Sequence, residues 1–210
     1  MAGVGVEIRL ATDLDAAVLA DIYAPFVESS ATSFETDPPS AEEMRRRLHE
    51  TTVAYPWLVC VCDDHVAGYA YATKHRLRTA YQWSVETSVY VHESFRRAGV
   101  GRGLYTSLFA ILAAQGFVNA YAGITLPNVH SVVLHESMGF LPVGVYRSIG
   151  YKTGAWHDVG WWHLLLRAHP HEPQAPVPLE HVRRGPAWET MLSSGVPLIH
   201  AQGDRGYGSV

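Results

Sequence analysis

A glycine-rich run at residues 96–103 reads Arg96-Arg97-Ala98-Gly99-Val100-Gly101-Arg102-Gly103. An apolar, strand-like segment ends shortly before it at Val89-Tyr90-Val91, and apolar residues follow it at helical spacing at Leu104, Leu108, Ile111 and Leu112. This order predicts a strand, a glycine loop and a helix. Bare backbone at a helix start directs several N–H groups and the positive end of the helix dipole at one point. The run therefore predicts an anion site suited to a pyrophosphate.

Two common phosphate-binding motifs do not fit this run. A P-loop requires Gly-Lys followed by Ser or Thr, which is missing. A dinucleotide fingerprint requires a third glycine at a fixed spacing, whereas Gly101 is followed by Gly103 and then Leu104. A nucleotide-binding oxidoreductase is therefore disfavoured. A glycine turn or helix cap without a ligand is the remaining alternative, and Arg96 and Arg97 favour the anion site over it.

Strand-like and helix-like patterns alternate over residues 6–168, which predicts an α/β fold with a mixed sheet flanked by helices. The expected strands are residues 6–11, 57–62, 66–74, 82–92, 118–125, 140–151 and 157–167, with Asp63-Asp64 as a tight hairpin turn. The expected helices are one that starts near Thr12 and weakens near Pro25, one from Ser40 to about His49, the one after the glycine run, and one over Asn128–Met138.

The C-terminal residues 169–210 differ in composition from the rest. They hold six of the twelve prolines and lack a sustained apolar period. This predicts a domain at residues 1–168 followed by a Pro-rich tail or arm outside the core, which could be removed without loss of fold. A short patch, Trp188-Glu189-Thr190-Met191-Leu192, could dock on a partner surface, but the composition favours a mobile extension.

Composition excludes several classes of protein. The chain has 210 residues, 48% of them hydrophobic, which is enough for a sizeable core and excludes disorder throughout. A net charge of −4 gives no basic excess for nucleic acid. Cys60 and Cys62 are two residues apart on one expected strand, a poor geometry for a disulfide. No apolar run is long enough for a membrane span, and Glu7 and Arg9 interrupt any signal peptide. We expect a cytoplasmic, reduced protein.

Two motifs resemble the GNAT acetyltransferase superfamily. Arg96-x-x-Gly99-x-Gly101, directly after the strand ending at Val91, resembles its pyrophosphate loop for acetyl-coenzyme A. Asn128-x-x-Ser131-x-x-x-His135-x-x-x-Gly139-Phe140 is similar to its next motif. Over residues 6–168 the chain resembles the phosphinothricin N-acetyltransferases, through Tyr55-Pro56-Trp57-Leu58-Val59, Ala80-Tyr81-Gln82-Trp83, residues 85–91, Leu126-Pro127-Asn128 and residues 154–160.

The resemblance implies a GNAT acyltransferase fold and a coenzyme site. The backbone at Val89 and Val91 would pair with the pantetheine arm, and an N–H near Val91 could polarise the thioester carbonyl. The pyrophosphate would be held by the glycine loop, and Asn128 would bond the pantetheine amide. The implied coenzyme residues are Val89, Val91, Arg96, Arg97, Gly99, Val100, Gly101, Arg102, Asn128 and Ser131.

Glu86 and His135 are the candidate catalytic residues. Acetyl transfer to an amine needs a base, and a carboxylate whose pKa is raised by an apolar setting can serve. Strand alternation places Glu86 with Ser88 on the face opposite Val85; an exposed acid is the alternative, but the position matches the family's catalytic glutamate. His135 can transfer protons near neutral pH, and in the family a histidine here acts with the glutamate. His135-Glu136-Ser137 lacks the second histidine of a zinc helix, so no metal is expected.

The acceptor is expected to meet two arginines close to Glu86 in sequence. Arg76 and Arg78 would suit a carboxylate and a second anionic group such as a phosphinate, although a solvated basic turn is the plain alternative. Phe34, on a mobile-looking loop, would cover the side chain. The expected acceptor residues are Phe34, Arg76, Arg78, Tyr81 and Ser88.

These residues predict an acetyl-CoA-dependent N-acetyltransferase that acts on the α-amine of small, phosphinothricin-like amino-acid analogues. The alternatives are the same chemistry on methionine sulfone, methionine sulfoximine or another amino acid, and a coenzyme-binding module without turnover, against which Glu86 and His135 argue. The resemblance also implies a homodimer. Trp156, Trp161 and Trp162 near the last strand would fit an interface, or could fill the core.

Overall fold

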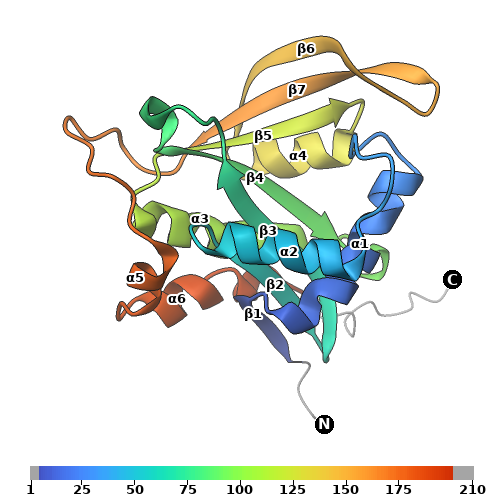
Figure 1. The fold of residues 1–210 in the computed structure, drawn as a ribbon. Helices are drawn as coiled ribbons and strands as arrows, with labels where there is room; N and C mark the ends of the chain where they lie inside the picture. The colour runs from blue at the N-terminus through green and yellow to red at the C-terminus, as the bar shows by residue number, and fades with distance from the viewer. Residues whose placement is uncertain (1–4, 201–210) are drawn as a thin grey trace, which may run out of the picture.

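The computed structural model describes residues 5–200. Its centre is one seven-stranded sheet in the order β1-β2-β3-β4-β5-β7-β6 (Figure 1). Neighbouring strands are antiparallel except β4 and β5, which are parallel. The strands are β1 (Val6–Leu10), β2 (Trp57–Cys62), β3 (His65–Lys74), β4 (Ser84–Val91), β5 (Asn119–Leu126), β6 (Leu141–Lys152) and β7 (Ala155–Leu165). The predicted mixed sheet flanked by helices is confirmed.

Helices cover both faces of the sheet. The α-helices are α1 (Ala16–Glu28), α2 (Ala41–Thr52), α3 (Val100–Gln115), α4 (Val129–Ser137), α5 (Leu179–Arg183) and α6 (Trp188–Ser193). Helices α1 and α2 pack on one face over Trp57, Val59 and Tyr69. Helix α3 packs on the other face over side chains that alternate with these, such as Leu58 and Cys60. The sheet therefore separates two apolar clusters.

Local sequence signals explain most element ends. Ser40 accepts the backbone N–H of Glu43 and so caps α2. Asp63 and Asp64 both have positive φ, as a tight hairpin turn between antiparallel strands requires. Helix α1 continues through Pro25 to Glu28, so the prediction that it weakens there is wrong. The helix continues because Val27, beyond the proline, is almost fully buried in the α1–α2 cluster.

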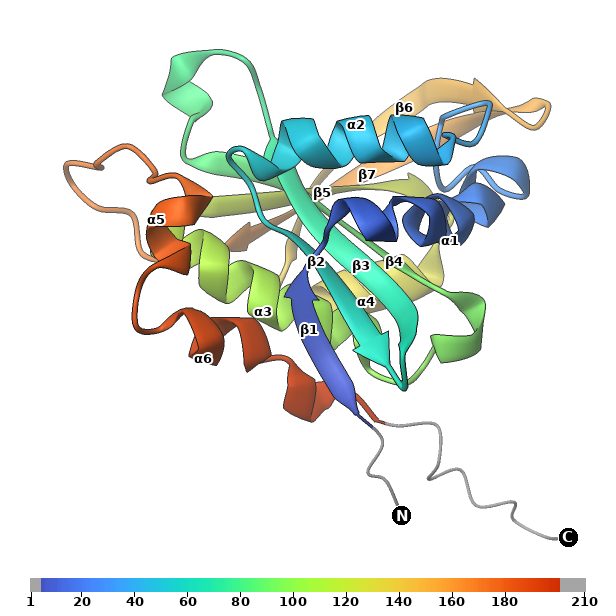
Figure 2. The ribbon, with the colours of Figure 1, turned by 60° about the horizontal axis from the view of Figure 1, so that its bottom comes forward.

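The C-terminal extension does not lie outside the core over the part that the structure describes. Leu179, Val182, Trp188 and Ile199 are buried in the same apolar cluster as α3. Figure 2 shows α5 and α6 packed along α3, with the chain then passing β1. The prediction of an external arm is thus corrected for residues 177–200. Residues 201–210 lie outside the described residues.

Two further predictions concern the thiols and the membrane. Cys60 and Cys62 are free and buried, with their Sγ atoms 3.8 Å apart. Burial raises the pKa of the Cys60 thiol. Within residues 5–200 no helix combines the length and the apolar character that a membrane span requires.

Candidate active site

The site begins where β4 and β5 diverge. The parallel ladder between them has only three pairs, Ser84 with Asn119, Val85 with Ala120 and Glu86 with Tyr121. Beyond Glu86, β4 continues to Val91 while paired only with β3. The β5-facing backbone groups of residues 88–91 therefore have no strand partner within residues 5–200 and can pair with an extended ligand, as an added strand would.

A cleft of about 980 Å³ lies beside this open strand. Val89 and Val91 line it from β4, and Leu134 lines it from α4. The glycine loop and the start of α3 close one end. All ten predicted coenzyme residues line this cleft: Val89, Val91, Arg96, Arg97, Gly99, Val100, Gly101, Arg102, Asn128 and Ser131.

The glycine loop has the geometry of an anion cradle. Gly99 has φ +80°, a left-handed conformation that favours glycine, and α3 starts at the next residue. The N–H groups of the first helical turn therefore face outward with the helix dipole behind them. Arg96 lies over the Phe26 ring at 5.8 Å, and neither Arg96 nor Arg97 has an ion-pair partner among residues 5–200. Their charges remain free for an anion.

The α4 side of the cleft differs in one detail from the prediction. Asn128 Oδ1 accepts the backbone N–H of Ser131 at 3.1 Å and so caps α4. The carbonyl oxygen of this amide is thereby used within the protein. Its NH₂ group has no partner in the described part of the chain and can donate to a ligand carbonyl in the cleft.

Glu86 does not occupy an apolar pocket. Its Oε1 accepts a hydrogen bond from His75 Nδ1 at 3.0 Å, and Arg76 lies 3.7 Å from the same oxygen. The His75 ring is stacked on Tyr121, with 4.5 Å between ring centroids. The predicted β4 alternation is confirmed, since Val85 and Thr87 are buried on the α3 face while Glu86 points the other way. The sequence-based prediction missed His75, although it immediately follows β3, the strand paired with β4.

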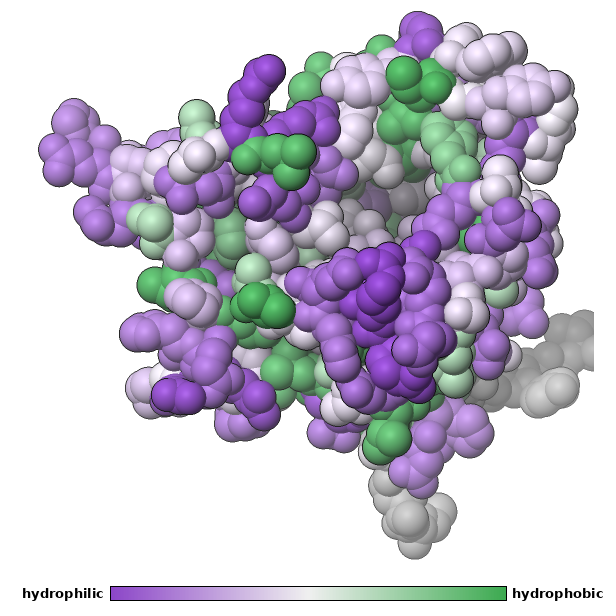
Figure 3. Space-filling view, viewed as in Figure 1, coloured by the Kyte–Doolittle hydropathy of each residue, from purple (hydrophilic) through white to green (hydrophobic). Residues whose placement is uncertain are grey.

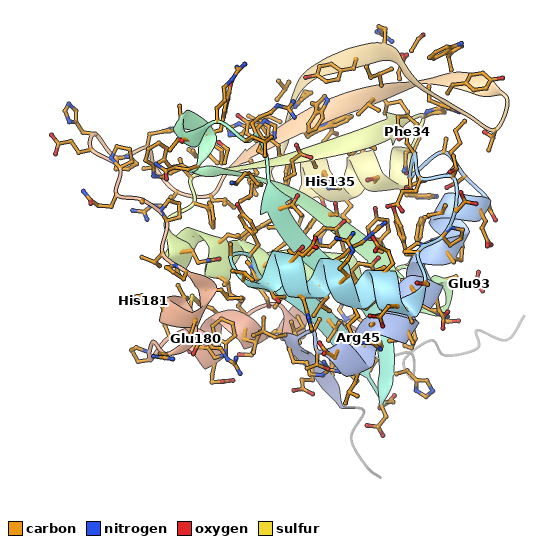
Figure 4. The ribbon with its side chains drawn as sticks, in the orientation of Figure 1. Phe34, Arg45, Glu93, His135, Glu180 and His181 are labelled. Atoms are coloured by element: carbon orange, nitrogen blue, oxygen red, sulfur yellow. The ribbon has the colours of Figure 1, made fainter. Side chains whose placement is uncertain are left out.

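His135 lies in the interior of the molecule, on α4 (Figure 4). Its Nδ1 donates to the Ser131 carbonyl at 2.7 Å, and its Nε2 accepts from the Tyr105 hydroxyl at 3.0 Å. Tyr105 and Phe140 pack around the ring within the α3-side cluster. Glu86 faces the opposite side of the sheet, so the structure does not bring the two predicted catalytic residues into contact. A catalytic role for His135 stays a prediction.

The charge of His135 follows from its surroundings. Burial lowers the pKa of this imidazole below its usual 6.5, against a smaller opposing effect of the Ser131 carbonyl. The native state therefore favours the neutral ring, whereas the unfolded chain binds the proton more readily. The contribution of His135 to the free energy of unfolding is therefore fully present above about pH 6.5, and it is lost as the pH falls below that value.

We expect His135→Gln, which stays neutral at every pH, to weaken this dependence. The Tm of the wild type should fall more steeply between about pH 7.5 and pH 5 than that of the variant. Thermal unfolding followed by circular dichroism measures both slopes. A shallower slope will remain in the variant, because burial also lowers the pKa of His163. Equal slopes would contradict the assignment to His135.

The predicted acceptor residues lie on the Glu86 side of the sheet. Arg78 is exposed and its guanidinium has no partner among residues 5–200, whereas Arg76 is engaged with Glu86 and lies over the Trp161 ring. Tyr81 meets the His75 ring edge-on, and Ser88 bonds the Tyr71 hydroxyl. Figure 3 shows the surface hollowed between the strongly polar α2 and the β6–β7 hairpin, where this face of the sheet is open.

Phe34 is held more firmly than its loop composition suggested. Its ring lies so close to Gly150 that a Cβ there would be 2.3 Å from it. Lys152, buried at the end of β6, donates from Nζ to the carbonyls of Val27 and Ser33. Figure 4 shows Phe34 beside the β6–β7 hairpin. The hairpin and Lys152 thus anchor the loop that carries Phe34.

The loop has a second anchor on the α2 side. The Glu35 carboxylate is bound by both terminal nitrogens of Arg47, at 2.7 and 2.9 Å. The Tyr23 hydroxyl contacts Glu35 at 3.0 Å and Ser33 at 2.6 Å. Burial raises the pKa of Tyr23 to about 12, so this hydroxyl stays protonated. The loop between α1 and α2 thus presents Phe34 from a fixed position.

Comparison with known proteins identifies the class. The family model described as an acetyltransferase (GNAT) domain matches residues 8–161. The chain belongs to the GNAT acetyltransferase family and is an N-acetyltransferase.

Individual members of the family show which acetyltransferases the chain is similar to. The chain is 45% identical over 157 residues to the phosphinothricin N-acetyltransferase of Streptomyces viridochromogenes, covering 75% of this chain and 86% of that one. It is 32% identical to the L-methionine sulfoximine/L-methionine sulfone acetyltransferase of Salmonella typhimurium, covering 77% and 95%. A phosphinothricin acetyltransferase from Sinorhizobium meliloti, solved in complex with acetyl-CoA, superposes with a TM-score of 0.77 at 32% identity, covering 80% and 93%.

Gly101 offers a direct check of the cleft. A Cβ at this position would point between Leu134, at 3.2 Å, and Val91, at 3.7 Å, both of which line the cleft. Gly101→Glu therefore introduces a side chain and a negative charge where an anionic ligand must approach. We expect calorimetry to show a loss of coenzyme A affinity of about 100-fold or more. Ala114→Glu, at an exposed position of the same helix, should bind normally. Unchanged affinity in Gly101→Glu would refute the loop assignment.

Proposed function

We propose that the chain transfers acetyl from acetyl-CoA to the α-amine of small amino-acid analogues of the phosphinothricin type. The observation that carries this proposal is the open edge of β4, which joins the glycine cradle at one end to Glu86 at the other. The names of the relatives support the acceptor class, since they acetylate phosphinothricin or methionine sulfoximine. A metal-independent reaction in the cytoplasm is part of the proposal.

The described residues fit acetyl-CoA. Residues 88–91 supply backbone that is unpaired on the β5 side for the pantetheine arm, and Asn128 offers its NH₂ group. The cradle at Gly99–Gly101 and the free guanidiniums of Arg96 and Arg97 supply positive charge for the pyrophosphate. When bound, the coenzyme supplies an acetyl thioester. A backbone N–H near Val91 would polarise its carbonyl.

Glu86 would accept the amine's proton. The amine nitrogen forms a bond to the acetyl carbon, the bond from that carbon to sulfur breaks, and the departing thiolate takes up a proton. His75 fixes the Glu86 carboxylate through Oε1, which leaves Oε2 to face the amine directly or through a water. Arg78, free of other partners among residues 5–200, would pair with the acceptor's carboxylate or phosphinate.

Thiol release from acetyl-CoA tests the proposal. Phosphinothricin, methionine sulfoximine, methionine sulfone and the common amino acids are compared at pH about 8, where more of the amine is neutral. We expect the highest kcat/KM with phosphinothricin. A higher value with methionine sulfoximine or sulfone would favour that acceptor instead. Coenzyme binding without thiol release from any acceptor would favour a non-catalytic module.

We also propose a homodimer formed through the β6–β7 hairpin. Strand β6 is an edge of the sheet and exposes several apolar or aromatic side chains: Leu141, Val143, Val145, Tyr146, Ile149 and Tyr151. Trp156 is 64% exposed beside them, whereas Trp162 fills the core. Light scattering at micromolar concentration should give twice the 23.2 kDa chain mass. A monomer mass would refute this interface.

A further inference from the structure

The C-terminal extension returns to the glycine loop. We call residues 195–200, which include the short helix η4 (Val196–Leu198), the C-terminal strap. The backbone N–H of His200 donates to the Ala98 carbonyl at 2.8 Å. A Cβ at Gly99 would lie only 2.0 Å from the Leu198 carbonyl oxygen. The strap therefore lies directly against the loop, far from it in sequence (Figure 2).

A second close contact locks the strap to α3. A Cβ at Gly103 would lie 2.7 Å from the Ile199 side chain, and a Cβ at Gly195 would lie 1.8 Å from the Gly103 carbonyl. Ser107 accepts the N–H of Gly195 at 3.1 Å, and donates to the chain just before the strap. Ile199 is buried in the α3-side cluster.

The missing side chains of the three loop glycines thus serve two different contacts. Gly101 faces the cleft, where its missing side chain leaves room for a ligand. Gly99 and Gly103 face the strap, where their missing side chains let two backbones approach. The motif that predicts a phosphate site therefore also encodes a docking surface for the C-terminal strap.

The strap also forms part of the cleft wall. Pro197, Leu198 and His200 line the same cleft as Arg96 and Val91. These three residues lie beyond residues 8–161, the part of the chain that the family model matches. The wall of the cleft near the loop is thus built partly by a segment outside the acetyltransferase domain model.

We propose that the C-terminal strap is a coenzyme-binding element of this enzyme. It holds the loop, which has positive φ at both Arg97 and Gly99, in the conformation that directs its N–H groups at the pyrophosphate. Such preorganisation raises affinity by removing the cost of ordering the loop on binding. His200 adds an imidazole at the phosphate end of the cleft. This inference rests on the proposed function, because it assigns a role in acetyl-CoA binding.

The test compares two acetyl donors in three full-length variants. Acetyl-CoA carries the pyrophosphate, whereas S-acetylpantetheine lacks all phosphates, so only the first depends on the loop. Ile199→Ala loosens the strap, and Val182→Ala is the matched control, because Val182 is an equally buried aliphatic residue of the same extension in α5. His200→Ala removes an exposed side chain of the strap and leaves the core intact.

For Ile199→Ala we expect kcat/KM with acetyl-CoA to fall about tenfold, and the Kd of coenzyme A to rise equally. The kcat/KM of Ile199→Ala with S-acetylpantetheine should change no more than the kcat/KM of Val182→Ala with the same donor. For His200→Ala we expect about a fivefold rise in the Kd of coenzyme A, the size expected for the loss of one hydrogen bond from the imidazole.

An equal loss with both donors in Ile199→Ala, or an unchanged coenzyme Kd in a folded variant, would overturn the proposal. If Ile199→Ala does not fold, the coenzyme Kd of His200→Ala decides: a rise supports the strap and no change overturns it. A wild type that binds no coenzyme A refutes the proposed function itself. Failure of the strap proposal can therefore be distinguished from failure of the proposed function.

Discussion

Replacing Glu86 by glutamine is expected to lower kcat by about 100-fold or more, with little change in KM, as is typical for the loss of a general base. Glutamine keeps the size of the side chain and can still accept the hydrogen bond from His75, but it cannot take up the amine's proton. Steady-state thiol release with the preferred acceptor measures both constants.

Two other variants make this result specific. Glu50→Gln, the same change at an exposed position of α2, should leave both constants unchanged. Arg78→Ala should instead raise KM for the amino acid by the equivalent of about 1.5 to 3 kcal/mol, because it removes a charged partner of the acceptor. If Glu86→Gln stays near wild type between about pH 6 and pH 9, another group or an ordered water is the base.

Ending the chain at Ala168 is expected to lower the Tm of the protein by about 10 °C and to promote its aggregation. Leu179, Val182, Trp188 and Ile199 each contribute about 1.5 to 3 kcal/mol of apolar burial, part of which offsets the cost of ordering the extension. Their loss also exposes the side of α3 that they cover. A net loss of about 4 kcal/mol would lower Tm by about 10 °C. Thermal unfolding followed by circular dichroism measures the change.

A chain that ends at His200 is the control for this truncation. It keeps every buried contact described for the extension, so it should unfold at the wild-type temperature. A chain ending at Ala168 that is soluble and equally stable would show that the extension contributes nothing to the fold. Such a result would also remove the basis for the C-terminal strap.

The central elements could be predicted because local signals and packing agree there. The period-two pattern of β4 fixes which side chains share a face, and the glycine run fixes the start of α3. The extension could not be predicted this way. Its few buried residues lie on two helices of five and six residues, α5 after Pro178 and α6 after Pro186, so no sustained period reveals that they reach the core. Their burial depends on α3, which is distant in sequence.

The catalytic neighbourhood was predicted only in part, for a similar reason. The position of Glu86 follows from its own strand, but its partner His75 comes from the chain just after β3 and meets it only through the β3–β4 pairing. His135 was placed correctly on a helix, yet its burial depends on Tyr105 and Phe140 from two other segments. Pattern gives the element that carries a side chain, whereas contacts between elements decide its environment.

Lys152 connects the β6–β7 hairpin to the loop between α1 and α2, so the positions of these two segments depend on each other. Its ammonium holds the carbonyls of Val27 and Ser33, so the end of β6 and the loop that carries Phe34 form one rigid body. In evolutionary terms, the sequence of the hairpin and the position of Phe34 are then coupled traits. If Phe34 covers the acceptor, as the sequence predicts, a lineage that changes its acceptor is expected to change both.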